Sequence, residues 1–133
     1  MKRRTVVVSL LAFNLTLLGS IAPSLANGWE FLGQRSVRLV TDRDVIPVNS
    51  RREYARIKLE VKETGIEIFN MTVTLRNGRT LNVPLRQFIG KNQQSRAIDL
   101  PGRDRSIRYV TLIYRSRPGS TERAIVKLYG KTR

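Results

Sequence analysis

Carboxylates are the side chains of this sequence that could carry acid–base chemistry. The 133 residues contain no histidine and no cysteine. The usual near-neutral general base, the commonest metal ligand and a thiol nucleophile are therefore all missing. A hydrolase built without them needs two carboxylates about 5 to 10 Å apart across a cleft, one with its pKa raised by burial. The candidate acids are Asp42, Asp44, Asp99, Asp104 and Glu122.

Arginines accompany most of these acids. An arginine lies directly beside four of them in the chain, which are Asp42, Asp44, Asp104 and Glu122. A neighbouring guanidinium favours the charged carboxylate and lowers its pKa, which suits ion pairing better than proton transfer. A carboxylate-dependent hydrolase acting on cell-wall material is therefore the alternative hypothesis, and a non-enzymatic binding or structural domain is the leading one.

Metal and cofactor chemistry have little support in the sequence. Asp42 and Asp44 could give two oxygen ligands to calcium, but the further ligands and the closing Glu of an EF-hand loop do not follow them. Pairing with Arg43 is the simpler role for these two acids. No glycine-rich run leads into Lys-Ser or Lys-Thr at a helix start, so a phosphate loop is not expected. We predict neither a metal nor a cofactor.

The basic side chains are the strongest compositional signal. The sequence has 25 Lys and Arg against 10 Asp and Glu, which gives a formal charge of +15. Such a surplus favours an anionic polymer or an acidic protein as partner, and it also promotes solubility. We expect a basic surface formed by Arg56, Lys58, Lys62, Arg86, Lys91, Arg96, Arg103, Arg105, Arg123 and Lys127.

The first 26 residues have the pattern of a cleaved signal peptide. Residues 2–4 are basic, residues 6–18 are largely apolar, and Ser24 and Ala26 place small residues before the cleavage point. The apolar run is shorter than the roughly 20 residues that a membrane-spanning helix needs. We predict cleavage after Ala26, a domain over residues 27–133 without a transmembrane segment, and a periplasmic or secreted location.

Two stretches set the architecture. In residues 54–62, Ala55, Ile57, Leu59 and Val61 alternate with charged residues, which indicates a strand with one buried and one wet face. Residues 106–115 are β-branched and aromatic on both alternating faces, which is typical of a central strand. The second stretch follows a tight turn at Leu100-Pro101-Gly102, and the sheet is expected to assemble around it.

Asn77-Gly78 marks a β-hairpin. A two-residue loop would place Val73 opposite the polar Asn82. A three-residue loop over residues 76–78 places Val73 opposite Leu81 and Met71 opposite Val83. The matching of apolar residues therefore predicts the longer loop, with Gly78 in the left-handed region.

The remaining segments complete an all-β domain. Further strands are predicted near residues 31–40, with a bulge at Gly33, and residues 66–76, with a bulge at 68–70 where the apolar phase shifts. A short strand at 96–100 and a closing strand from Ala124 that stops before Gly130 follow. Residues 41–52 and 85–97 are predicted as loops. Trp29 is predicted as an apolar plug at the end of the sandwich, with a ligand-stacking platform as the alternative. The fold class is a single antiparallel β-sandwich of about seven or eight strands.

Three motifs carry a family resemblance. They are Leu32-Gly33, Thr41-Asp42-Arg43-Asp44-Val45-Ile46, and Arg96-Ala97-Ile98-Asp99-Leu100-Pro101-Gly102 followed by Arg105-Ser106-Ile107. In these motifs the chain resembles small exported bacterial proteins of an uncharacterised domain family, over essentially all of residues 27–133. The resemblance implies an exported β-domain and assigns no catalytic residue.

Overall fold

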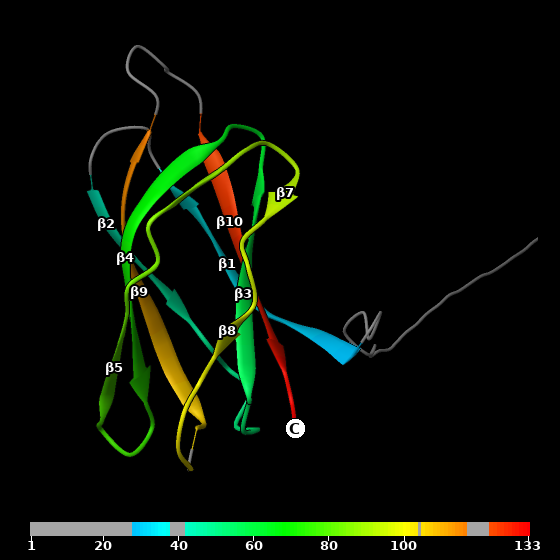
Figure 1. Ribbon diagram of the computed structural model, residues 1–133, viewed down its shortest axis with the longest axis vertical. Helices are drawn as coiled ribbons and strands as arrows, with labels where there is room; N and C mark the ends of the chain where they lie inside the picture. Colours follow the sequence, from blue (N-terminus) through cyan, green and yellow to red (C-terminus); the bar gives the residue numbers. More distant parts are fainter. Residues whose placement is uncertain (1–27, 38–41, 104, 117–122) are drawn as a thin grey trace, which may run out of the picture.

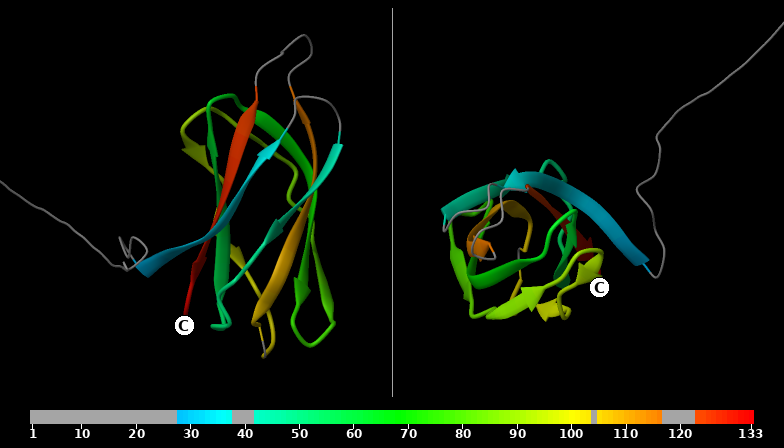
Figure 2. Two further views of the ribbon diagram at one scale, coloured as in Figure 1. Left: turned by 180° about the vertical axis from the view of Figure 1, so that it is seen from behind. Right: turned by 90° about the horizontal axis from the view of Figure 1, so that it is seen from above.

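The computed structural model describes residues 28–37, 42–103, 105–116 and 123–133. These residues form ten strands in two antiparallel five-stranded sheets that pack face to face (Figures 1 and 2). The predicted β-sandwich is confirmed, with ten strands where seven or eight were expected. The predicted signal segment lies outside the described residues, and the described part of the chain holds no helix with the length and apolar character needed to span a bilayer. The strands are β1 (Trp29–Val37), β2 (Asp42–Pro47), β3 (Arg56–Lys62), β4 (Ile66–Leu75), β5 (Thr80–Val83), β6 (Gln87–Ile89), β7 (Gln93–Gln94), β8 (Ile98–Asp99), β9 (Ile107–Ser116) and β10 (Ala124–Lys131).

Each sheet is built around three long strands. Sheet A has the order β1-β10-β3, and the two short strands β7 and β8 both pair with the far edge of β3. Sheet B has the order β2-β9-β4, and β5 and β6 both pair with the far edge of β4. The predicted central strand is therefore confirmed, because β9 is hydrogen-bonded on both sides.

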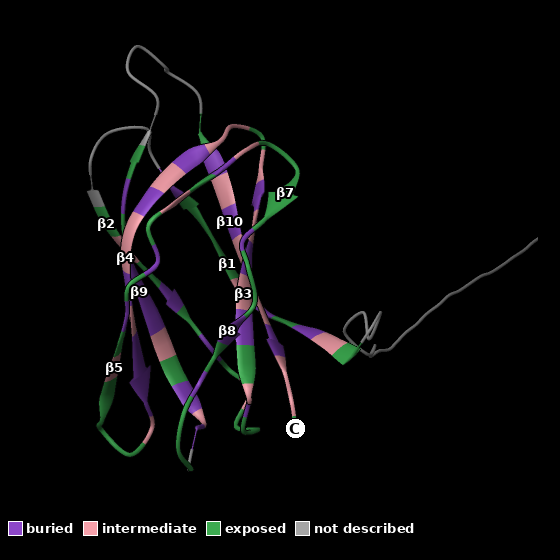
Figure 3. Ribbon diagram, viewed as in Figure 1, coloured by how far each residue is buried: buried purple, intermediate pink, exposed green. Residues whose placement is uncertain are grey.

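The alternation in the sequence defines the core. Ile57, Leu59 and Val61 of β3 are fully buried, whereas the residues between them are partly exposed (Figure 3). In β9 the apolar set that begins with Val110 is fully buried, while Ile113 on the other face is exposed. Burial of such side chains stabilises the fold by about 1.5 to 3 kcal/mol each relative to exposure. The facing layers of the two sheets thus supply most of the folding free energy.

The predicted hairpin and bulges are confirmed. Val73 pairs with Leu81 and Met71 with Val83, and Gly78 has a φ of 92°. The β4 register shifts between Ile68 and Asn70. The β1 register shifts between Phe31 and Gly33.

Two connections and the end of one strand differ from the sequence prediction. Residues 42–47 form strand β2 instead of a loop, because β9 offers a free edge and Ile46 is fully buried in the core. Pro47 ends this strand at the margin of sheet B, where its missing N–H is tolerated. The predicted loop over residues 85–97 contains β6 and β7, which pair with β4 and β3. Strand β10 continues through Gly130 to Lys131 instead of stopping before the glycine.

Candidate functional site

The outer face of sheet A gathers basic side chains from two adjacent strands. Directly paired residues of neighbouring strands project to the same face of a sheet. Lys131 of β10 pairs with Arg56 of β3, and Ile125 pairs with Lys62. Lys58 and Lys127 lie between these pairs on the same face, because side chains alternate along each strand. We call this set the basic face, and it consists of Arg56, Lys58, Lys62, Lys127 and Lys131.

Three aromatic rings border the basic face. Trp29 of β1 pairs with Lys131, and Phe31 pairs with Tyr129. The rings of Phe31 and Tyr129 meet edge to face at 5.8 Å between centroids, and Phe31 is 40% exposed. The Nζ of Lys58 lies 4.4 Å from the centroid of the Trp29 ring, and that of Lys131 lies 5.9 Å from it. Both lysines are thus held over an aromatic surface by cation–π attraction.

Trp29 is not the core plug that the sequence suggested. Its pairing with Lys131 directs the ring outward, and it is only partly buried. The inward position next to it in β1 belongs to Glu30, which is 6% exposed. Glu30 accepts hydrogen bonds from the Tyr54 hydroxyl at 3.0 Å and from the Arg52 guanidinium. Burial raises the pKa of Tyr54, against the opposing effect of its hydrogen bond with Ser50.

Few acids offset the basic face. Asp99 accepts a hydrogen bond from the Arg56 Nε at 3.0 Å. Glu60 forms an ion pair with Lys62 at 3.4 Å and accepts a hydrogen bond from the Tyr129 hydroxyl at 3.0 Å. Burial, followed by the Glu60 hydrogen bond and charge, raises the pKa of Tyr129 to about 12. Five cations therefore share the face with these two carboxylates.

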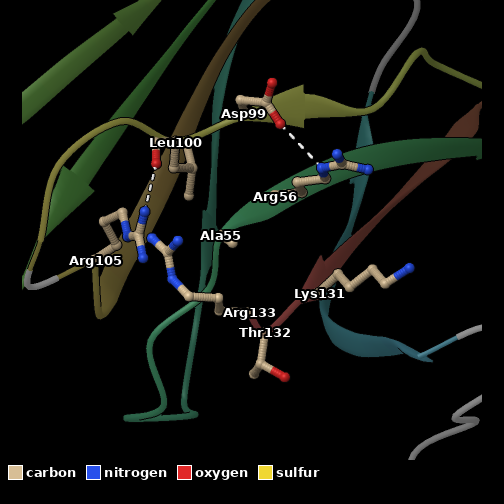
Figure 4. A pocket seen from close by; sticks show the side chains of 8 residues that line it. All are labelled: Ala55, Arg56, Asp99, Leu100, Arg105, Lys131, Thr132 and Arg133. Atoms are coloured by element: carbon tan, nitrogen blue, oxygen red, sulfur yellow. Dashed lines mark hydrogen bonds and ion pairs between the residues drawn. The ribbon is translucent and has the colours of Figure 1, made fainter.

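A hollow of about 480 Å³ opens at one end of the basic face (Figure 4). Arg56 and Lys131 belong to both features, so the positive charge of the face continues into the hollow. The rest of the lining comes from β8, from the segment after β10, and from the segments that precede β3 and β9. These residues are Ala55, Asp99, Leu100, Arg105, Thr132 and Arg133.

The structure brings together only part of the predicted basic surface. Arg56, Lys58, Lys62 and Lys127 lie together on the basic face. Arg86 instead lies over the ring of Phe69 in sheet B, at 5.4 Å from its centroid. The other exposed predicted residues are distributed over connecting segments, and they are Lys91, Arg96, Arg103 and Arg123.

Arg105 is a correction to the predicted basic surface. It was expected at an exposed rim, but it is 7% exposed and its Nη1 donates a hydrogen bond to the Leu100 carbonyl at 2.8 Å. The physical reason is that Leu100 is itself buried, so its carbonyl needs a donor, and the Arg105 guanidinium supplies that donor inside the fold. Lys131 and Arg133 were missed by sequence reasoning, although extending the β10 alternation past Gly130 would have placed Lys131 on the wet face.

The candidate acids of the hydrolase hypothesis are dispersed. Asp44 lies in β2 of sheet B. Its carboxylate accepts hydrogen bonds from the Tyr114 hydroxyl at 2.8 Å and from the Arg35 Nε at 3.2 Å. Asp99 lies in β8 of sheet A with an 82% exposed side chain. The side chain of Asp42, and the whole of Asp104 and Glu122, lie outside the described residues. The two described candidates therefore hold separate positions and each has a basic partner.

A family model for a domain of unknown function, DUF2541, matches residues 6–130. The chain belongs to the DUF2541 family. The sequence-based resemblance to an uncharacterised domain family is thereby confirmed. No match is found among curated proteins.

The DUF2541 fold is similar to part of a solved structure, that of AlgX from Pseudomonas aeruginosa. The similarity has a TM-score of 0.50 at 14% sequence identity, and it covers 75% of this chain. The chain spans about a quarter of the AlgX structure it matches, 26%. At this identity the similarity concerns the fold.

Proposed function

We propose that this DUF2541 domain is an exported, non-enzymatic binding domain of the bacterial envelope whose basic face holds an anionic polymer. The observation that carries the proposal is the joining of five cations from β3 and β10 on one sheet face, where Asp99 and Glu60 are the acids that pair with them among the residues that the structure describes. The signal-peptide pattern of residues 1–26 supports the proposed export.

The spacing of the cations suits a polymer better than a single small anion. Neighbouring strands lie about 4.8 Å apart, and alternate residues along a strand are about 6.6 Å apart. Side chains on this lattice meet an extended ligand at several points, and each point adds an electrostatic contact. The aromatic rings beside the cations offer flat apolar area for the uncharged parts of such a chain.

The salt dependence of binding tests this proposal. Short duplex DNA, lipopolysaccharide and an anionic wall polymer would each be titrated into the full chain at several salt concentrations. For duplex DNA the logarithm of the binding constant should fall linearly with the logarithm of salt, with a slope of about 0.9 per neutralised phosphate. Up to five contacts are available on the basic face, so a slope between roughly 2 and 4.5 is expected.

Two paired variants separate the basic face from net charge. Lys58→Gln with Lys127→Gln should reduce the duplex slope by about 2. The control is Arg79→Gln with Arg108→Gln, which removes the same charge at two exposed arginines, one in the turn before β5 and one in β9. It should leave the slope nearly unchanged. Equal losses in both double variants, or no binding of any polymer at low salt, would overturn the proposal and leave the charge as a solubility feature.

A further inference from the structure

Half of the eight residues that line the hollow at the end of the basic face are cations. They are Arg56, Arg105, Lys131 and Arg133, and Asp99 is the one acidic side chain among the lining residues (Figure 4). That carboxylate is held by the Arg56 Nε at 3.0 Å. In Figure 4 the guanidinium ends of Arg105 and Arg133 point toward each other on the opposite side of the hollow. Two like charges thus line one hollow, and their mutual repulsion costs free energy unless an anion is bound near them.

Arg105 is a buried cation with unused donors. It is 7% exposed, and the hydrogen bond of its Nη1 to the Leu100 carbonyl leaves most of its five N–H groups available. Its Nε is buried without a hydrogen-bond partner. Among the described carboxylates, none forms an ion pair with this guanidinium. A buried charge in this state is costly, and an oxyanion would satisfy it.

A second hollow adjoins the first through the same two arginines. It has a volume of about 620 Å³, and Arg105 and Arg133 line both spaces. Arg103 adds a further cation to the second hollow. Glu53 also lines the second hollow, and its carboxylate accepts a hydrogen bond from the backbone N–H of Arg105 at 3.4 Å. The guanidinium pair therefore stands where the two hollows meet, with cations on either side.

We infer that this arginine pair forms a discrete binding site for a single oxyanion, such as a phosphate, sulfate or carboxylate group. Arg105 is the fixed donor, because the carbonyl of Leu100 holds its guanidinium in place. Arg133 closes on the anion from the exposed side. The planar fork of a guanidinium matches two oxygens of such a group, so the pair selects oxyanions over chloride. This site goes beyond the proposed polymer binding, because one small anion can occupy it alone.

Titration with inorganic phosphate, sulfate and acetate tests the site on the full-length chain. The total ionic strength would be kept constant with sodium chloride, and the Nε–H signals of the arginines would be followed by NMR. We expect saturable shifts of the Arg105 signal with at least one of the three anions, and their ranking identifies phosphate, sulfate or carboxylate as the preferred group. Shifts that never saturate, or that chloride reproduces equally, would overturn the inference.

Variants make the test specific. Arg133→Gln should weaken binding of the preferred anion by about tenfold or more, because one charge-assisted pair is lost. Arg79→Gln is the matched control and should leave it unchanged. Arg105→Lys keeps the charge but loses the fork, so it should weaken binding while the fold is retained. Unchanged affinity in Arg133→Gln would contradict the site.

The same variants distinguish this site from the polymer-binding face. Lys58→Gln with Lys127→Gln should leave the affinity for the small anion intact while it reduces the salt slope for duplex DNA. Arg133→Gln should weaken the binding of the small anion and leave the salt slope for duplex DNA unchanged. Loss of both activities in both variants would contradict two independent sites. If one variant leaves the activity assigned to its own site unchanged, the proposal for that site fails and the other proposal stands.

Discussion

Gly130→Ala is predicted to destabilise the domain through one collision in the core. An added Cβ at this position would lie 2.7 Å from the Tyr54 Cδ1 and 2.8 Å from the Leu32 Cδ1. Carbon atoms in contact prefer about 3.5 to 4.0 Å, so both side chains would have to move. Tyr54 cannot move freely, since its hydroxyl is held by Ser50 at 2.7 Å and by Glu30 at 3.0 Å.

The expected magnitude combines two opposing terms. Overpacking of a core costs about 1 to 3 kcal/mol. Replacing a strand glycine by alanine returns about 0.5 to 1 kcal/mol, because the unfolded chain loses freedom. The net loss of stability is therefore about 1 kcal/mol, within a range of about 0 to 2.5 kcal/mol. Each kcal/mol lowers Tm by about 4 to 8 °C for a domain near 100 residues.

Urea unfolding followed by the fluorescence of the single tryptophan measures this loss. In a Leu32→Ala background the added methyl of Gly130→Ala no longer meets the Leu32 Cδ1. The free energy of unfolding should therefore fall less on substitution there than in the natural sequence. A Gly130→Ala variant at least as stable as the natural protein would refute the collision. Equal costs in both backgrounds would show that Leu32 takes no part in it.

Three further predictions concern single positions. Gly78→Val should destabilise by about 1 to 3 kcal/mol, because a β-branched residue at a φ of 92° is strained although nothing lies within 4 Å, whereas Gly78→Asn should cost less; thermal unfolding compares them. Tyr129 should ionise in the folded protein with a pKa of about 12, so the stability from its neutral form is present below about pH 10 and is lost as pH rises through 12. Glu60→Gln should lower that pKa while burial keeps it above the ordinary value, and a folded-state titration at the ordinary value would contradict this account; ultraviolet absorbance follows it. Intact-mass analysis of envelope fractions should find a mature chain beginning at Asn27, and a full-length species retained in the membrane would exclude cleavage.

Local alternation predicted the strands whose residues meet a core on one side. It succeeded for β3 and β9, and parity within the hairpin was enough to identify the left-handed Gly78. It failed for β2, because the acidic start of that strand is stabilised by pairing with β9, which is distant in the sequence. It also failed at Gly130, where the strand continues because the absence of a side chain makes room for Tyr54.

The candidate site was predictable strand by strand but not as a whole. The wet-face positions of Lys58 and Lys127 follow from period-two patterns. Their proximity depends on the pairing of β3 with β10, which no local pattern specifies. The outward position of Trp29 depends on the bulge after Phe31, and the burial of Arg105 depends on the Leu100 carbonyl that accepts its hydrogen bond.

Trp29 gives the most direct measurement of the central claim, because this single tryptophan lies on the basic face beneath Lys58. An anionic polymer that binds there must displace or reorient this lysine. The account predicts that titration of the full chain with such a polymer at low salt changes the Trp29 emission to a saturating level, and that added salt reverses the change. Polymer binding detected by co-sedimentation without any change in Trp29 emission would contradict the account.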